Sequence, residues 1–115
     1  MKSLISINRQ QLKGKHYIRL ATSFCYWFDF TSGRMQSYVR RHGDNFCIVI
    51  NGSEDNDDTF IIPYKDARKV FTSDALDGRK RWTGYIRHNT LRIPTGDKSL
   101  LVERFHNAFH LLESS

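Results

Sequence analysis

Two short runs of apolar residues constrain the fold of this chain more than any other feature. The runs are Phe46–Ile50 and Thr59–Ile62, and neither alternates with polar residues. Strands of this kind are usually buried on both faces of a sheet. Between them lies the polar segment 51–58, which opens with Asn-Gly, a dipeptide typical of tight reversals. The sequence therefore predicts an antiparallel pair of strands at the centre of a sheet, with helices covering both sides.

The flanking segments predict one further strand and two short helices. Residues Phe24–Phe30 are rich in aromatic residues, which favour strands. Arg34–Arg41 is expected to form a short helix that ends at Gly43. Pro63 ends the second apolar run and suits the start of another short helix over Tyr64–Phe71.

The C-terminal third predicts a hairpin followed by a helix. Trp82–Arg87 and Thr90–Ile93 have the composition of two strands that reverse at residues 88–89. From Asp97 to Glu113, apolar residues recur at helical spacing, which predicts an amphipathic helix packed against a sheet.

These elements define the expected fold class. It is α+β, with a mixed, mainly antiparallel sheet, two short helices and a C-terminal amphipathic helix. The 115 residues suit one domain with its own core, over residues 1–115. Within it, residues 1–23 are expected to form an N-terminal arm or a helix.

Cysteine usage and hydropathy predict a soluble cytoplasmic protein. Cys25 and Cys47 lie within apolar segments, so we expect buried free thiols in a reducing compartment. No apolar run approaches the roughly 20 residues that span a bilayer. The N-terminus also lacks the apolar region and cleavage site of a secretion signal. We therefore expect no membrane contact.

Positive charge is concentrated in the N-terminal half of the chain. The net charge is +6, from 18 Lys or Arg and 12 acidic residues. Residues 1–53 contain eight Lys or Arg and two acidic residues, whereas the two signs balance in residues 54–115. This asymmetry predicts a cationic face.

The segment 78–92 has the most one-sided chemistry. It contains five Arg or Lys, no carboxylate, and the aromatic residues Trp82 and Tyr85. Cations bind phosphates and rings stack on bases, so the pattern indicates nucleic acid; a solvated cationic sheet edge is the alternative. The cationic residues 40–42 are expected to extend the same surface. The predicted nucleic-acid-binding residues are Arg40, Arg41, His42, Arg79, Lys80, Arg81, Tyr85, Arg87, His88, Asn89 and Arg92.

Strand parity assigns different roles to the two aromatic residues of this segment. Trp82 shares its face with Ile86, so we expect Trp82 to lie in the core. Tyr85 shares its face with Thr83 and Arg87, so we expect Tyr85 to stack on a base.

A pattern of strands extends over residues 24–93. It comprises Tyr26-Trp27-Phe28, the buried run Phe46–Ile50, an acidic turn, Ile61-Ile62-Pro63 and the aromatic strand Trp82–Ile86. In this pattern the chain resembles small prokaryotic modules found with restriction enzymes and mobile-DNA nucleases. The Ile-Pro step before a helix is also similar to the B3-like DNA-recognition domains. The resemblance implies a role in DNA biology in a prokaryotic cell.

Candidate catalytic and metal sites are incomplete. A PD-(D/E)XK nuclease needs a carboxylate two residues before its lysine, and Pro63 occupies that position before Lys65. A zinc site requires a third protein ligand in addition to His106 and His110. We interpret these two histidines as residues at the edge of the apolar stripe of a helix. The acidic residues 54–58 are interpreted as a solvated turn.

The sequence thus predicts a non-catalytic module that recognises nucleic acid, in the first place double-stranded DNA, without a cofactor or metal. One alternative is a divergent metal-dependent nuclease that uses Asp58. Another is a protein-interaction module, such as an anti-restriction or toxin–antitoxin partner. A protein partner or a homodimer is compatible with each of these hypotheses.

Overall fold

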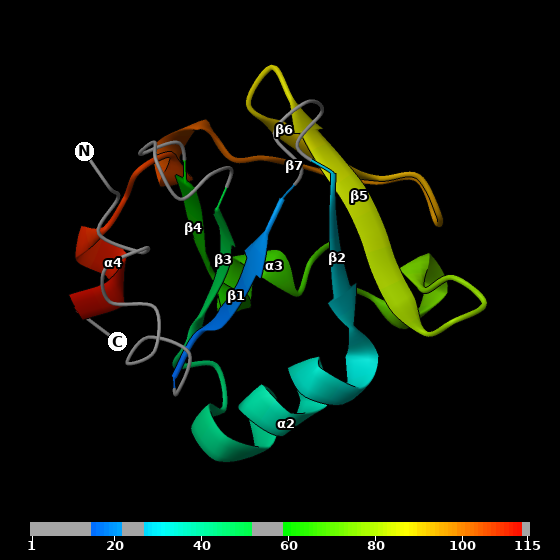
Figure 1. Ribbon diagram of the computed structural model, residues 1–115, viewed down its shortest axis with the longest axis horizontal. Coiled ribbons are helices and arrows are strands. Elements are labelled where there is room, and N and C mark those ends of the chain that lie inside the picture. Colours follow the sequence, from blue (N-terminus) through cyan, green and yellow to red (C-terminus); the bar gives the residue numbers. More distant parts are fainter. Residues whose placement is uncertain (1–14, 22–26, 52–58, 114–115) are drawn as a thin grey trace.

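The computed structural model describes residues 15–21, 27–51 and 59–113, which form two sheets (Figure 1). The first sheet has the strand order β1-β3-β4. Strand β1 is parallel to β3, and β3 is antiparallel to β4. The bounds of these strands are Tyr17–Leu20 for β1, Cys47–Asn51 for β3 and Thr59–Pro63 for β4.

The second sheet is antiparallel throughout and has the order β2-β5-β6-β7. Its long strand β5 pairs with β2 through its first half and with β6 through its second half. The predicted class, a mainly antiparallel α+β fold, is confirmed, with the strands divided between two sheets. The bounds are Phe28–Thr31 for β2, Arg81–Arg87 for β5, Thr90–Ile93 for β6 and Lys98–Leu101 for β7.

In the described residues, three short α-helices connect or follow the strands. They are α2 (Ser32–His42), α3 (Tyr64–Ala67) and α4 (His110–Glu113). The predicted first helix is confirmed by α2, which begins after Thr31 and ends at Gly43. The Thr31 hydroxyl accepts a hydrogen bond from the backbone N–H of Arg34, which satisfies one of the free donors at the helix start. None of the helices in the described residues is long and apolar enough to cross a bilayer.

The three-stranded sheet is buried on both faces, as its continuous apolar runs predict. Alternate residues such as Ile48 and Ile50 pack toward the second sheet and α2, in the larger core cluster. The intervening residues Cys47 and Val49 pack with Leu112 of the C-terminal segment in a smaller cluster. Cys47 is buried and is not part of a disulfide, as predicted.

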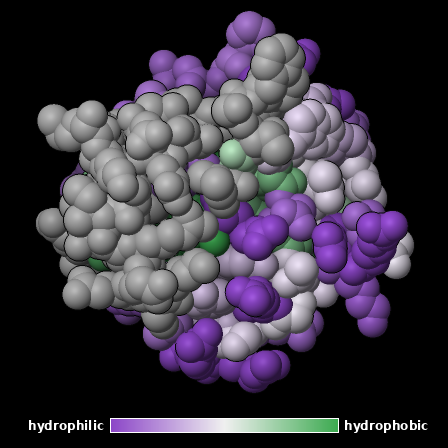
Figure 2. Space-filling model, viewed as in Figure 1, coloured by the Kyte–Doolittle hydropathy of each residue, from purple (hydrophilic) through white to green (hydrophobic). Residues whose placement is uncertain are grey.

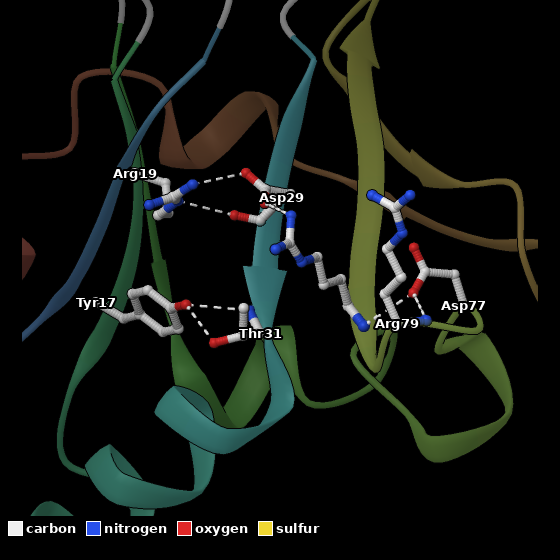
Figure 3. Close-up of polar contacts among 7 residues, drawn as sticks. Tyr17, Arg19, Asp29, Thr31, Asp77 and Arg79 are labelled. Atoms are coloured by element: carbon white, nitrogen blue, oxygen red, sulfur yellow. Dashed lines mark hydrogen bonds and ion pairs between the residues drawn. The ribbon is translucent and has the colours of Figure 1, made fainter.

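Side chains of β1 join the two sheets along the free edge of β2 (Figure 3). The hydroxyl of Tyr17 accepts a hydrogen bond from the backbone N–H of Thr31 at 3.0 Å. The guanidinium of Arg19 donates to the backbone carbonyl of Asp29 at 3.0 Å and to its carboxylate at 2.8 Å. These bonds satisfy edge groups of β2 that no strand in the described ranges pairs, and so they cover an edge that could otherwise pair with another chain.

The expected helix over 97–113 is wrong. Residues 98–101 instead form strand β7, a 3₁₀ turn follows over Glu103–Phe105, and only α4 is helical. Asn107 interrupts a helix, because its φ is +52° and its side chain accepts the backbone N–H of Thr59 at 3.0 Å. Pairing with β6 and β4 therefore overrides the helical spacing of the apolar residues.

Three smaller expectations also change. The segment 15–21, part of the region expected to be an arm or a helix, contains β1, and pairing with β3 makes β3 the central strand and β4 an edge. Helix α3 ends at Ala67 and not at Phe71. Residues 1–14, Cys25 and the acidic residues 54–58 lie outside the described residues.

Replacing Gly84 by alanine is expected to lower the free energy of unfolding by about 1–3 kcal/mol. A Cβ at this position would overlap the carbonyl oxygen of Arg92 and lie 2.9 Å from Cζ of Phe28. Chemical denaturation measures the effect. Gly33→Ala is the matched control: its Cβ meets nothing within 4 Å, and the change should stabilise α2 by about 0.5–1 kcal/mol. Equal stability changes in the two variants would contradict the close approach at Gly84.

Candidate nucleic-acid interface

The hairpin of β5 and β6 carries the predicted nucleic-acid-binding residues from Arg81 to Arg92. It reverses at His88 and Asn89, whose φ angles are +52° and +59°. Positive φ at both central residues defines a type I′ turn, whose twist matches that of the flanking strands. The predicted two-residue turn is confirmed, and both side chains are exposed at the hairpin tip.

The alternation along β5 separates the two aromatic residues as predicted. Trp82 and Ile86 are buried, whereas Arg81, Thr83 and Arg87 are exposed. Trp82 is 6% exposed, and its indole N–H donates to the backbone carbonyl of Thr72 at 2.7 Å. Tyr85 lies between the exposed arginine and threonine side chains on the opposite face of the strand and is partly buried.

The side of the second sheet that faces away from the core forms a continuous surface, which we call the outer face. Cross-strand register aligns its members, because Tyr85 lies opposite Arg92, and Arg92 lies opposite Ser99. In the view of Figure 2, hydrophilic residues gather at the two ends of β5, with paler surface between them. The outer face consists of Trp27, Asp29, Arg81, Thr83, Tyr85, Arg87, Arg92, Ser99 and Leu101.

A pair of rings, the exposed Trp27 and the partly buried Tyr85, occupies the middle of the outer face. Trp27 is 42% exposed, and its ring centroid lies 5.0 Å from that of Tyr85, with an angle of 57° between the planes. The guanidinium of Arg87 lies 5.7 Å from the Tyr85 centroid, within cation–π range. Among the described residues, the large hydrophobic side chains that are exposed are Trp27 and Leu101, and both lie on this face. The outer face therefore combines accessible rings with guanidinium groups.

The charges of the outer face are mainly positive. Asp29 binds two guanidinium groups, at 2.8 Å from Arg19 and 3.4 Å from Arg81. Arg92 contacts Asp97 at 2.7 Å, in an exposed pair of a kind that contributes about 0–1 kcal/mol and that a phosphate can replace. Arg87 has no carboxylate partner within the described ranges.

The turn before β5 holds the other predicted cations of this segment. The carboxylate of Asp77 accepts the backbone N–H groups of Arg79 at 2.8 Å and Arg81 at 3.1 Å (Figure 3). These two bonds hold the pKa of Asp77 below its usual value, with the Arg81 N–H as the larger cause. The charged carboxylate thereby fixes a turn that exposes Arg79 and Lys80 beside the start of β5.

The cations at the end of α2 lie apart from the outer face. Arg40 borders a cavity of about 400 Å³ whose wall includes Trp82, which is on the buried side of β5. The Arg41 guanidinium lies 5.0 Å from the Tyr38 ring, and the His42 ring packs near Phe46. Arg40 therefore lies on the side of β5 opposite Tyr85 and Arg87 and is not part of the outer face, and phosphate binding by residues 40–42 stays a prediction.

The alternative catalytic features do not converge in the described part of the chain. His106 and His110 do not share a helix, since His106 precedes α4 and forms an isolated bridge with Phe60. No group of three or more His, Cys, Asp or Glu that could hold a metal occurs in the described ranges. Lys65 is exposed on α3, and Asp58 lies outside the described residues.

Sequence reasoning missed three residues of this region. Along the strand 24–30, alternation puts Trp27 on the opposite face from Phe28, and this parity is the signal that could have identified Trp27 as a residue of the outer face. Leu101 was assigned to a helix stripe, and Arg19 lies in the segment without a firm prediction. Comparison of the chain with protein-family models, with curated proteins and with solved structures found no match.

Proposed function

We propose that the protein is a non-catalytic nucleic-acid-binding module and that its outer face is the binding surface. The observation that carries this proposal is the Trp27–Tyr85 ring pair on the outer face with Arg87 and Arg92 beside it. Aromatic rings stack on the flat faces of bases, and guanidinium groups form forked hydrogen bonds with phosphate oxygens.

The distribution of charge supports the same surface. The cations Arg79, Lys80 and Arg81 stand at one end of β5, and Arg87 stands at the other end. The one carboxylate of the outer face, Asp29, is neutralised by two guanidinium groups. A polyanion that crosses the sheet would thus meet cations at both ends and rings between them.

The biological setting remains a proposal that rests on the sequence resemblance. That resemblance favours DNA in a restriction or mobile-element system of a prokaryotic cell. The proposed function is nucleic-acid binding as a class, and double-stranded DNA is one of the forms it includes. The nuclease alternative depends on Asp58, and it is distinguished by metal-dependent cleavage of DNA.

A protein partner is the second candidate, and one observation favours it. Leu101 is 62% exposed on the outer face, and exposed apolar side chains mark protein interfaces when they cluster. Binding to a protein or to a second copy of the chain through Leu101 would depend little on salt, whereas phosphate binding depends on it strongly. The salt dependence of binding therefore separates the two candidates.

Removing a cation of the outer face is expected to reduce the salt dependence of nucleic-acid binding. The logarithm of affinity should fall linearly with the logarithm of salt concentration. Each of Arg87→Ala and Arg92→Ala should reduce the slope by about 0.9 on duplex or about 0.7 on single strands, measured by fluorescence anisotropy.

Arg68→Ala is the matched control, because Arg68 is exposed beside α3 and away from the outer face. It should leave the slope unchanged. An unchanged slope in Arg87→Ala and Arg92→Ala, or an equal loss in Arg68→Ala, would rule out this face as the phosphate-binding surface.

A further inference from the structure

We infer that the outer face binds single-stranded nucleic acid and that unpaired bases stack on Trp27 and Tyr85. This inference rests on the proposed function and narrows it to one class of partner. It follows from where the rings lie, what they can reach and where the remaining cations stand.

The rings lie within a sheet surface and not on a projection. Trp27 precedes β2, and Tyr85 is on β5, the neighbouring strand in the sheet. Their contact at 5.0 Å makes one aromatic platform between two strands. In a duplex, the faces of the bases are covered by their neighbours, so rings in a broad surface cannot reach them. Unpaired bases can turn outward and stack on such a platform.

Guanidinium groups stand next to the platform in two directions. Along β5, Arg87 follows Tyr85 by two residues on the same face and lies over its ring at 5.7 Å. Across the sheet, Arg92 is opposite Tyr85 on the adjacent strand, and adjacent strands are about 4.8 Å apart. A base on the Tyr85 ring would therefore have its own phosphates within reach of a guanidinium.

Within the described ranges, Arg40 does not add a second line of phosphate contacts for a duplex on the outer face. Arg40 borders a cavity on the buried side of β5, so it cannot meet the second strand of a duplex docked on the outer face. The hairpin of β5 and β6 is a two-stranded ribbon of the kind that enters a major groove, and its tip offers His88 and Asn89 for base edges. A duplex would therefore use the tip and leave the ring pair unused.

The test compares one oligonucleotide of about 12 nucleotides, single-stranded and as a duplex with its complement, in the same buffer with the full chain. Fluorescence anisotropy of the labelled strand gives both affinities. We expect the single strand to bind about tenfold more tightly or better. Tyr85→Leu should weaken single-strand binding by about fivefold or more, whereas Tyr85→Phe, which keeps the ring, should stay within about twofold. Thermal unfolding verifies that both variants are folded.

Intrinsic fluorescence gives an independent measurement, because the chain has two tryptophans and Trp82 is buried. Single-stranded oligonucleotide should quench the emission of the wild type and leave that of Trp27→Phe unchanged. Equal or tighter binding of the duplex, or no effect of Tyr85→Leu, would overturn the single-strand inference and leave nucleic-acid binding standing. Binding of neither form would overturn the proposed function together with the inference.

Discussion

Replacing Trp82 by alanine is expected to lower the free energy of unfolding by about 3–5 kcal/mol. The ring is 6% exposed and packs edge-on against Phe71, with centroids 5.5 Å apart. Its removal also leaves the backbone carbonyl of Thr72 without its indole donor. The side chain already borders a cavity of about 400 Å³. Few neighbouring atoms are therefore available to move into the volume that the indole ring leaves. Urea denaturation at neutral pH measures the loss.

Tyr85→Ala is the matched control for Trp82→Ala on the same strand. Tyr85 lies on the outer face, so its truncation should change stability by about 1 kcal/mol or less while it weakens nucleic-acid binding. A larger stability loss for Tyr85→Ala than for Trp82→Ala would mean that the two faces of β5 have been exchanged.

The free energy of unfolding is also expected to fall as pH decreases from about 6.5 to about 4, because of His16. The His16 side chain is 1% exposed, and its Nδ1 accepts the backbone N–H of Cys47 at 2.9 Å. Burial, followed by the charge of Lys15, lowers the pKa of His16 from 6.5 to about 4. Below pH 6.5 the unfolded chain binds a proton that the folded chain excludes, so stability is lost on acidification, and the loss levels off once the pH falls below about 4.

The size of this effect is about 3 kcal/mol, from 1.36 kcal/mol for each unit of pKa difference. Urea denaturation over a pH series from neutral to about 4 measures it. His16→Gln keeps a side chain that can accept the Cys47 N–H but does not titrate, so its stability should vary much less over this range. His88→Gln removes an exposed histidine and should retain the dependence of the wild type. A His16→Gln variant as sensitive to pH as the wild type would contradict the assignment.

Local patterns predicted the parts of the fold that depend on local chemistry. The continuous run 46–50 predicted a strand buried on both faces, the 88–89 pair predicted a tight hairpin, and Gly43 predicted the end of α2. The helical spacing of apolar residues in 97–113 predicted a helix that does not form. The pairing of β7 with β6 and the bonds between Asn107 and Thr59 replace it, and these arise only in the tertiary structure. Strand β1 has only four residues, too few for a clear periodicity.

The candidate site divides in the same way. Parity along one strand predicted that Tyr85 and Arg87 share a face away from Trp82. The sequence could not show that β2 brings Trp27 beside Tyr85, since the two residues are far apart in the chain. It also could not show that Arg40 borders a cavity beside Trp82, away from the outer face, because that depends on how α2 packs. The sequence therefore assigned Arg40 and the cations of segment 79–92 to one surface, whereas the fold places Arg40 away from the outer face.

The most direct test of the binding surface is chemical-shift mapping of isotope-labelled protein titrated with single-stranded oligonucleotide. We expect the largest changes at the indole N–H of Trp27 and at the amides of Tyr85, Arg87 and Arg92. The indole of Trp82 should change little, because it is buried and bonded to Thr72. The largest changes at residues 40–42, at the cavity beside Trp82, or at no residue at all would contradict the outer face as the nucleic-acid-binding surface.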